Sequence, residues 1–280
     1  MDIQKKFLQF EHLLFRQLKD QFKQLAKEIV PQQIHDFRLS IKKLRAFVEG
    51  SQMVLDSPES RLCYKRILKL FDHMGVIREI QINRELYTKY ESGLPSSLHT
   101  LLDRKEQKAN AAFSRYLKEM QLYELKVLNL SCSFYLESST SALLLQKLHS
   151  GIEKNFKILF AHLCKRNWKR QLHPIRIRIR HLWELMQILR MFDDTDILMS
   201  FIDHLKTLNR KLGDWHDLEV ALFDCPNYWK HIPDQKEVLV KLTDSLETQK
   251  QILEADIYQN LLLSGPFKAA YPHLLNTGAH

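Results

Sequence analysis

Residues 154–183 read KNFKILFAHLCKRNWKRQLHPIRIRIRHLW, and this stretch holds nine Lys or Arg residues with no Asp or Glu. The whole chain has 42 basic and 33 acidic residues, so the rest of it is balanced, with 42 − 9 = 33 basic side chains against 33 acidic ones. The formal net charge of +9 is therefore one local feature. A concentrated positive block attracts polyanions, whereas the same charge spread evenly would mainly confer solubility.

The end of this stretch has the periodicity of an amphipathic helix. His173, Arg176 and Arg180 fall at i, i+3 and i+7, so they share one side of a helix. Residues 34–47, far upstream, repeat the pattern as IHDFRLSIKKLRAF. Apolar residues occupy a different face, which predicts that each helix buries one face and presents a basic stripe beside it. The upstream stripe is His35, Arg38, Lys42 and Arg45, and the apolar faces are Phe37, Ile41, Leu44 and Val48, and Ile175, Ile179, Leu182 and Met186.

The two stripes belong to a longer internal repeat. His35 and His173 are 173 − 35 = 138 residues apart, and Gly75 and Gly213 are separated by the same 138 residues. Because matches at this offset extend from position 16 to position 95, the chain is predicted to be an internal duplication. We place the repeats at residues 1–137 and 138–280. The predicted fold is all-α, with two four-helix-type halves whose basic stripes face each other across one shared cleft.

Helix signals set the expected boundaries. Pro31 suits the first position of a helix, where its missing N–H costs no hydrogen bond. Gly75 suits a left-handed cap, so a helix is expected to end there. Asp214 and Asp217 are interpreted as caps of a helix that begins after Gly213, in preference to a role in orienting a basic residue. A turn is expected at 56–58 and a break at 138–141. The predicted helices are 3–27, 31 onward, 59–75 and 78–90, followed by a long amphipathic segment to about residue 130.

Composition fits a mostly helical, soluble protein. The 280 residues include only 7 Gly and 8 Pro, and 45% are hydrophobic. The four Cys residues form no CxxC pair, which indicates a reduced compartment. The N-terminus lacks the uninterrupted apolar core of a signal peptide, and no window approaches twenty apolar residues. We therefore expect a cytoplasmic protein without membrane association.

These motifs resemble the CHAD family, the conserved histidine α-helical domain. The resemblance rests on IHDFRLSIKKLRAF at 34–47, LHPIRIRIRHLWEL at 172–185, GVIREIQI at 75–82 and GDWHDLEV at 213–220. It implies two four-helix bundles, related by pseudo-twofold symmetry, that flank a basic cavity and bind inorganic polyphosphate. Trp183 departs from the family pattern, which has a base there. No ExExK motif is present, so the chain resembles the stand-alone form without a catalytic triphosphate tunnel domain.

The candidate polyphosphate site combines both stripes with the basic residues around them. The resemblance implies contacts from His35, Arg38, Lys42, Arg45, His173, Arg176 and Arg180. Bases spaced one helical turn apart follow successive phosphates, and Arg offers a planar fork for each. A nearby phosphate also favours charged His, which predicts tighter binding as pH falls through about 6 to 7. The remaining candidates are Arg16, Lys19, Lys27, Lys43, Lys154, Lys157, Lys165, Arg210 and Lys211.

Other functions remain open at this point. The sequence has no GxxxxGK[ST], HExxH or DxDxDG motif and no His pair at i, i+3 or i, i+4, so we predict neither an enzyme nor a bound cofactor or metal. Phosphoryl transfer to a histidine, or a metal held between His35 and His173, is the enzymatic alternative. Nucleic-acid binding is the second, although the stripes are interleaved with Ile and Leu rather than with base-reading or stacking residues. Docking on polyphosphate granules is compatible with the main interpretation.

Overall fold

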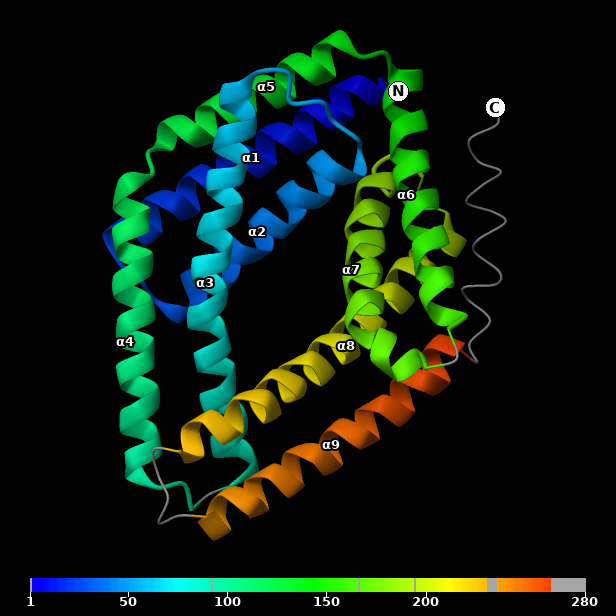
Figure 1. Cartoon of the computed structure of the whole chain (residues 1–280). Coiled ribbons are helices and arrows are strands. Elements are labelled where there is room, and N and C mark those ends of the chain that lie inside the picture. The colour runs from blue at the N-terminus through cyan, green and yellow to red at the C-terminus, as the bar shows by residue number, and fades with distance from the viewer. Residues whose placement is uncertain (1, 92, 166, 194, 231–235, 263–280) are drawn as a thin grey trace.

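The computed structural model describes residues 2–91, 93–165, 167–193, 195–230 and 236–262, and within these ranges the regular structure is entirely helical (Figure 1). No helix of this part of the chain is long and apolar enough to cross a membrane. The elements are α1 (Ile3–Lys27), α2 (Pro31–Gly50), α3 (Pro58–Tyr90), α4 (Ser96–Glu119), α5 (Leu122–Ser138), α6 (Ser141–Leu163), a 3₁₀ turn η1 (Trp168–Gln171), α7 (Leu172–Leu189), α8 (Asp196–Trp229) and α9 (Lys236–Leu262).

Side-chain caps start four of these helices. The side-chain oxygens of Asp2, Ser57, Thr140 and Thr195 each accept a hydrogen bond from a backbone N–H of the first turn that follows. Such N–H groups have no partner inside the helix, so each cap fixes where its helix begins. The predicted helix 3–27, the turn before residue 58 and the break at 138–141 are confirmed.

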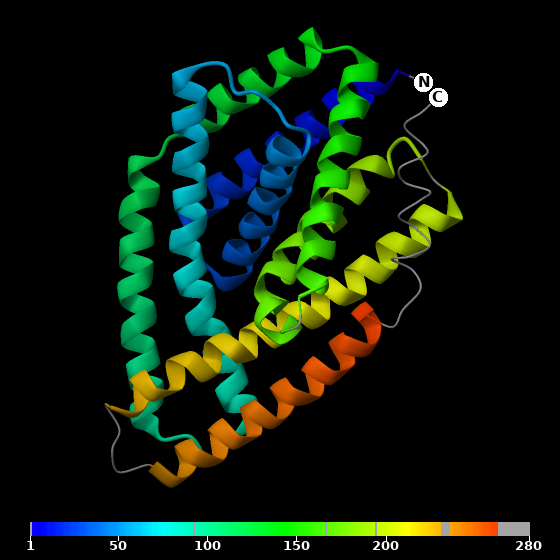
Figure 2. The same cartoon turned by 45° about the vertical axis from the view of Figure 1, so that its right-hand side comes forward.

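Helix starts recur at the 138-residue offset found in the sequence. α1 begins at Ile3 and α6 at Ser141, and α3 begins at Pro58 and α8 at Asp196, each pair 138 residues apart. The starts of α2 and α7, and of α4 and α9, follow the same offset to within three residues. In Figure 2 the long helices α3 and α8 cross each other, while α4 lies beside α3 and α9 beside α8.

Two expected helix ends are wrong. Gly75 lies inside α3, which is continuous over 33 residues, and Gly213 lies inside α8. Asp214 therefore caps no helix, and neither does Asp217. The amphipathic segment expected to reach about residue 130 also divides, because α4 ends at Glu119 and a capping box of Gln121 and Glu124 starts α5.

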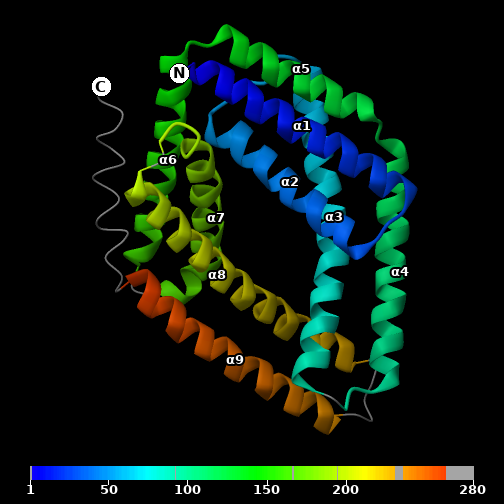
Figure 3. The ribbon, with the colours of Figure 1, turned by 180° about the vertical axis from the view of Figure 1, so that it is seen from behind.

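The hydrophobic core forms two clusters. The larger one contains α3 residues up to Ile77 and α8 residues up to Trp215, together with residues of α1, α2, α5, α6 and α7, the C-terminal part of α4 and Ile257 of α9. The smaller one begins at Ile80 in α3 and Leu218 in α8 and is completed by α4 and α9. Both clusters draw on both sides of the boundary predicted at 137/138. Figure 3 shows α1 and α5 side by side at one end of the molecule and α8 and α9 at the other.

Candidate functional site

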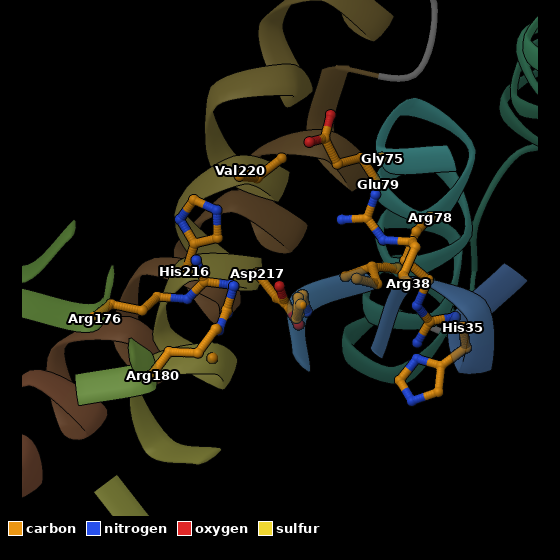
Figure 4. A pocket seen from close by; sticks show the side chains of 13 residues that line it. His35, Arg38, Gly75, Arg78, Glu79, Arg176, Arg180, His216, Asp217 and Val220 are labelled. Carbon is orange, nitrogen blue, oxygen red and sulfur yellow. The ribbon is translucent and has the colours of Figure 1, made fainter. Parts of the chain in front are cut away.

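A cavity of about 230 Å³ lies where α2, α3, α7 and α8 meet (Figure 4). Its α3 and α8 residues, 75–82 and 213–220, fall where those helices pass from one apolar cluster to the other. We call this cavity the central pocket. It is lined by His35, Arg38, Lys42, Gly75, Arg78, Glu79, Ile82, Arg176, Arg180, Gly213, His216, Asp217 and Val220.

The lining of the central pocket is paired across the two repeats. Six of its residues have a partner in the same lining 138 positions later, and only His35 has none, since His173 lies outside it. The stripes of α2 and α7 thus approach one pocket from opposite sides, as Figure 4 shows. The pairs are Arg38 with Arg176, Lys42 with Arg180, Gly75 with Gly213, Arg78 with His216, Glu79 with Asp217, and Ile82 with Val220.

The stripe cations are partly buried and form no ion pairs with described residues. Within the described part of the chain, Arg38, Lys42, Arg176 and Arg180 form no ion pair within 4.0 Å. The Nε of Arg176 is buried and donates no hydrogen bond. Buried charges are normally paired, because leaving water without a partner costs several kcal/mol. Partly buried cations that converge on a pocket without ion-pair partners are the arrangement expected of an anion-binding site.

Arg38 is held in place by α3. Its Nη1 donates a hydrogen bond of 2.6 Å to the carbonyl of Phe71, and its guanidinium lies 4.1 Å from the centre of the Phe71 ring. A Cβ added at Gly75 would lie 3.0 Å from that Nη1, whereas one added at Gly213 would meet nothing within 4 Å. Gly75 is thus a close-approach glycine that leaves space for the guanidinium.

Burial and mutual repulsion weaken the protonation of these cations. Burial, reinforced by Arg180, Arg38 and Arg176, lowers the pKa of Lys42 to about 7. Burial also lowers the pKa of Arg38 and of Arg176 to about 10 each and lowers the pKa of Arg180. Lys42 is therefore only about half charged near neutral pH, while the three guanidinium groups stay charged.

Two acids share the central pocket with the cations. Burial raises the pKa of Asp217 to about 6, against the opposing charge of Arg176, and burial raises the pKa of Glu79. With Arg38, Lys42, Arg78, Arg176 and Arg180 charged, the lining holds five cations and two acids, a net charge of 5 − 2 = +3. The central pocket therefore attracts anions at any pH at which the protein is folded and its arginines are charged.

The pocket histidines are neutral near pH 7. Burial and the charge of Arg78 lower the pKa of His35, and burial with the charge of Arg176 lowers the pKa of His216 to about 3. In the protein without ligand, both rings thus act as neutral donors or acceptors rather than as cations.

Two further cavities continue the central pocket along the contact between α2 and α7. The first, about 140 Å³, shares Lys42 and Arg180 with it and adds Arg45 and His181. The second, about 320 Å³, shares Arg45 and His181 with the first and adds Lys154 and Arg178. Glu184, whose pKa is raised to about 7 by burial, lines the first of them. The three cavities together form a row of basic side chains.

The predicted site residues divide by position. The central pocket contains His35, Arg38, Lys42, Arg176 and Arg180, and the adjoining cavities contain Arg45 and Lys154. Lys43 is half-buried on α2, and His173 is exposed at the start of α7. The others lie outside these three cavities: Arg16, Lys27 and Arg210 are exposed, Lys19 donates to Asn129, Lys157 pairs with Glu153, Lys165 donates to Gln171, and Lys211 pairs with Asp256.

Sequence reasoning missed several pocket residues. Arg78 and His216 each follow a repeat glycine by three positions, so the spacing that marked Gly75 and Gly213 contained the signal. Glu79 and Asp217 directly follow Arg78 and His216 in the sequence. Acidic residues are not expected in an anion site, so the sequence offered no reason to include them. Arg178 and His181 lie in the basic block itself, on the side of α7 that the stripe does not use.

Comparison with known proteins identifies the fold. The family model for the CHAD domain matches residues 12–222. The crystal structure of the CHAD domain from the plant Ricinus communis superposes with a TM-score of 0.70 at 14% sequence identity, over 93% of this chain and 92% of that one. No curated protein matches the sequence.

Proposed function

The chain belongs to the CHAD domain family, and we propose that it binds inorganic polyphosphate in the central pocket, without hydrolysing it. The proposal rests on one observation: Arg38, Lys42, Arg176 and Arg180 converge on one pocket and, among the described residues, form no ion pair within 4.0 Å. Folding has already removed these cations from water, so an anion that enters gains their attraction with little further desolvation of the protein.

A linear polyanion suits the shape of the basic surface. The central pocket and the two adjoining cavities share residues in sequence, which gives a path along the contact between α2 and α7. Bases at i, i+3 and i+7 are separated by about 5 Å along a helix, which exceeds the distance between neighbouring phosphates, so successive bases would contact about every second phosphate of an extended chain. Arg binds two oxygens of one phosphate in its fork, and Lys42 provides a movable point charge. Binding a polymer at several positions would also retain the protein on cytoplasmic polyphosphate granules.

Calorimetric titration with long-chain polyphosphate tests the proposal. We compare the wild type with an Arg38→Ala, Arg176→Ala double variant at about 0.15 M salt, because screening weakens surface attraction more than buried contacts. The control is an Arg104→Ala, Arg115→Ala variant, which removes the same charge from two exposed positions of α4. We expect the pocket variant to lose at least tenfold in affinity and the control to lose less than threefold.

Two further measurements separate this function from its alternatives. Duplex DNA is added as a competitor, and displacement of polyphosphate at equal phosphate concentration would mark a generic basic surface. Orthophosphate release is followed during prolonged incubation with polyphosphate. If the wild type releases orthophosphate steadily and the Arg38→Ala, Arg176→Ala variant does not, the pocket hydrolyses polyphosphate and the proposal of binding without hydrolysis is wrong.

A further inference from the structure

Three potential metal ligands converge at the edge of the central pocket. His173 lies in the first turn of α7, and His216 and Glu219 lie one turn apart in α8. The two imidazole rings have their centroids 5.0 Å apart, and Nδ1 of His216 lies 3.8 Å from Oε2 of Glu219. One ligand atom from each side chain lies within 4.8 Å of the other two. That Nδ1 is buried and has no hydrogen-bond partner.

These distances are close to those of a coordinated ion. Zinc binds nitrogen and oxygen at about 2.0–2.2 Å, so neighbouring ligand atoms of a tetrahedral site are about 3.4 Å apart. The pair formed by His216 and Glu219 already approaches this value, and no pair needs to close by more than about 1.4 Å. His173 is exposed, so rotation of its side chain provides that movement.

We propose that His173, His216 and Glu219 bind a divalent first-row transition metal, Zn²⁺ foremost, beside the central pocket. Two imidazoles and one carboxylate suit zinc and its neighbours, whereas Mg²⁺ prefers oxygen ligands alone. Three protein ligands leave a coordination position open, as in metal sites that bind a further anion. The positive charges of Arg176 and Arg180 oppose a cation here, and the carboxylates of Glu219 and Asp217 offset them.

The first repeat shows what the ion would replace. The positions equivalent to His216 and Glu219 are 216 − 138 = 78 and 219 − 138 = 81, which hold Arg78 and Gln81. A guanidinium and an amide cannot form this site, so it belongs to the second repeat alone. A divalent ion with the carboxylate of Glu219 has a charge of +2 − 1 = +1, the same as Arg78. In the pair formed by Arg78 and His216, the second repeat has a neutral imidazole where the first has a guanidinium. The metal ion thus restores a positive charge at that position.

A second consequence rests on the proposed function. His216 lines the central pocket, so the open position of the ion is available to a phosphate oxygen of a bound polyphosphate chain. The ion then contributes an anchor in the second repeat where Arg78 contributes one in the first.

The metal site is tested first in the absence of polyphosphate. Metal-free full-length chain is titrated with ZnCl₂, and Co²⁺ serves as a spectroscopic probe of the ligands. We expect one equivalent of tight binding that falls at least tenfold in Glu219→Gln and in His216→Arg. His12→Gln removes an exposed histidine of α1 and should match the wild type. Equal zinc binding by the wild type and His216→Arg would overturn the site, provided that both retain the same helical circular dichroism.

The link to polyphosphate is then measured separately. Polyphosphate affinity is compared with and without one equivalent of Zn²⁺ in the wild type and in His216→Arg. Free polyphosphate chelates the same amount of Zn²⁺ in both samples, so His216→Arg controls for that loss of metal. We expect Zn²⁺ to raise wild-type affinity about threefold or more, and His216→Arg to bind well in both conditions because it carries the cation permanently. Zinc binding without any polyphosphate binding would contradict the proposed function and leave the metal site standing. Equal zinc effects in both proteins would refute the link.

Discussion

We predict that Lys42 makes the proposed polyphosphate binding dependent on pH above neutrality. Its pKa is about 7 in the free protein because it is buried beside Arg180, Arg38 and Arg176. A phosphate in contact with the ammonium group favours the charged form and raises this pKa toward the ordinary value of about 10.5. Below pH 7 the lysine is protonated in both states and affinity does not depend on it. Above pH 7 binding must take up a proton, so affinity falls as pH rises.

The size of the effect follows from the two pKa values. With a free pKa of about 7 and a bound pKa between about 9 and 10.5, proton linkage weakens binding by about 25- to 50-fold between pH 7 and pH 9. His35, whose pKa is lowered by burial, also interacts with Lys42 from the same helix. The other titrating groups that face Lys42 are Glu184 on α7 and Asp217 on α8, with pKa values of about 7 and about 6. Both are largely ionised by pH 8, so the slope above that value belongs to Lys42.

Calorimetry in two buffers of different ionisation enthalpy measures the proton uptake directly. We expect nearly one proton per site at pH 8 for the wild type. Lys42→Arg keeps the positive charge but does not titrate below pH 10, so its uptake should be near zero and its affinity nearly constant from pH 8 to 9. Lys43→Arg, the neighbouring position on α2, should behave as the wild type. An unchanged uptake in Lys42→Arg would refute the assignment.

Three variants test the structure around the site. Gly75→Ala places a Cβ 3.0 Å from Nη1 of Arg38, so it should weaken polyphosphate binding by about tenfold, which corresponds to the loss of one charged contact. At Gly213 an added Cβ meets no atom within 4 Å, so Gly213→Ala should preserve affinity in the same titration. It should also stabilise α8 by about 0.5–1 kcal/mol. Gly151→Ala would place its Cβ against the carbonyl of Gly50 and should lower the free energy of unfolding in urea by about 1–3 kcal/mol; an unchanged midpoint would mean that α2 and α6 separate easily. Lys42→Met removes an unpaired buried cation, so it should raise unfolding stability by about 1–4 kcal/mol and abolish proton-linked binding; destabilisation would show that the ammonium group is satisfied in the free protein.

Local periodicity explains what the sequence predicted well. The first helix, Ile3–Lys27, and the stripes on α2 and α7 follow from the spacing of apolar and basic residues, which any helix must obey. The offset of 138 residues, found by matching single residues, also relates six pairs that line the central pocket. A single repeat distance therefore predicted which helices carry the site.

Contacts between distant segments explain what the sequence did not predict. Gly75 looked like a helix end, yet it lies inside α3. Its lack of a side chain fits the close approach of the Arg38 guanidinium, a contact with α2 that the local sequence does not reveal. His173 and His216 show no metal spacing along the chain, because 216 − 173 = 43 residues separate them and only the packing of α7 on α8 brings them together. The acids Asp217 and Glu184 were missed because their effect depends on burial beside cations, which charge patterning does not report.

The position of the central pocket explains how a helical protein holds unpaired buried cations. α3 and α8 each run through both apolar clusters, and their pocket residues lie where one cluster ends and the other begins. The apolar clusters on both sides fix α3 and α8, and α2 and α7 are packed into the larger cluster, so the backbones that carry the pocket side chains are held in place. The pocket cations therefore lose part of their hydration when the protein folds. A phosphate that enters the pocket would interact with charges that are already positioned. An exposed base such as Lys157, which is 66% accessible and pairs with Glu153, offers only screened attraction. The same charge on a helix shoulder thus serves solubility or binding according to the packing beneath it.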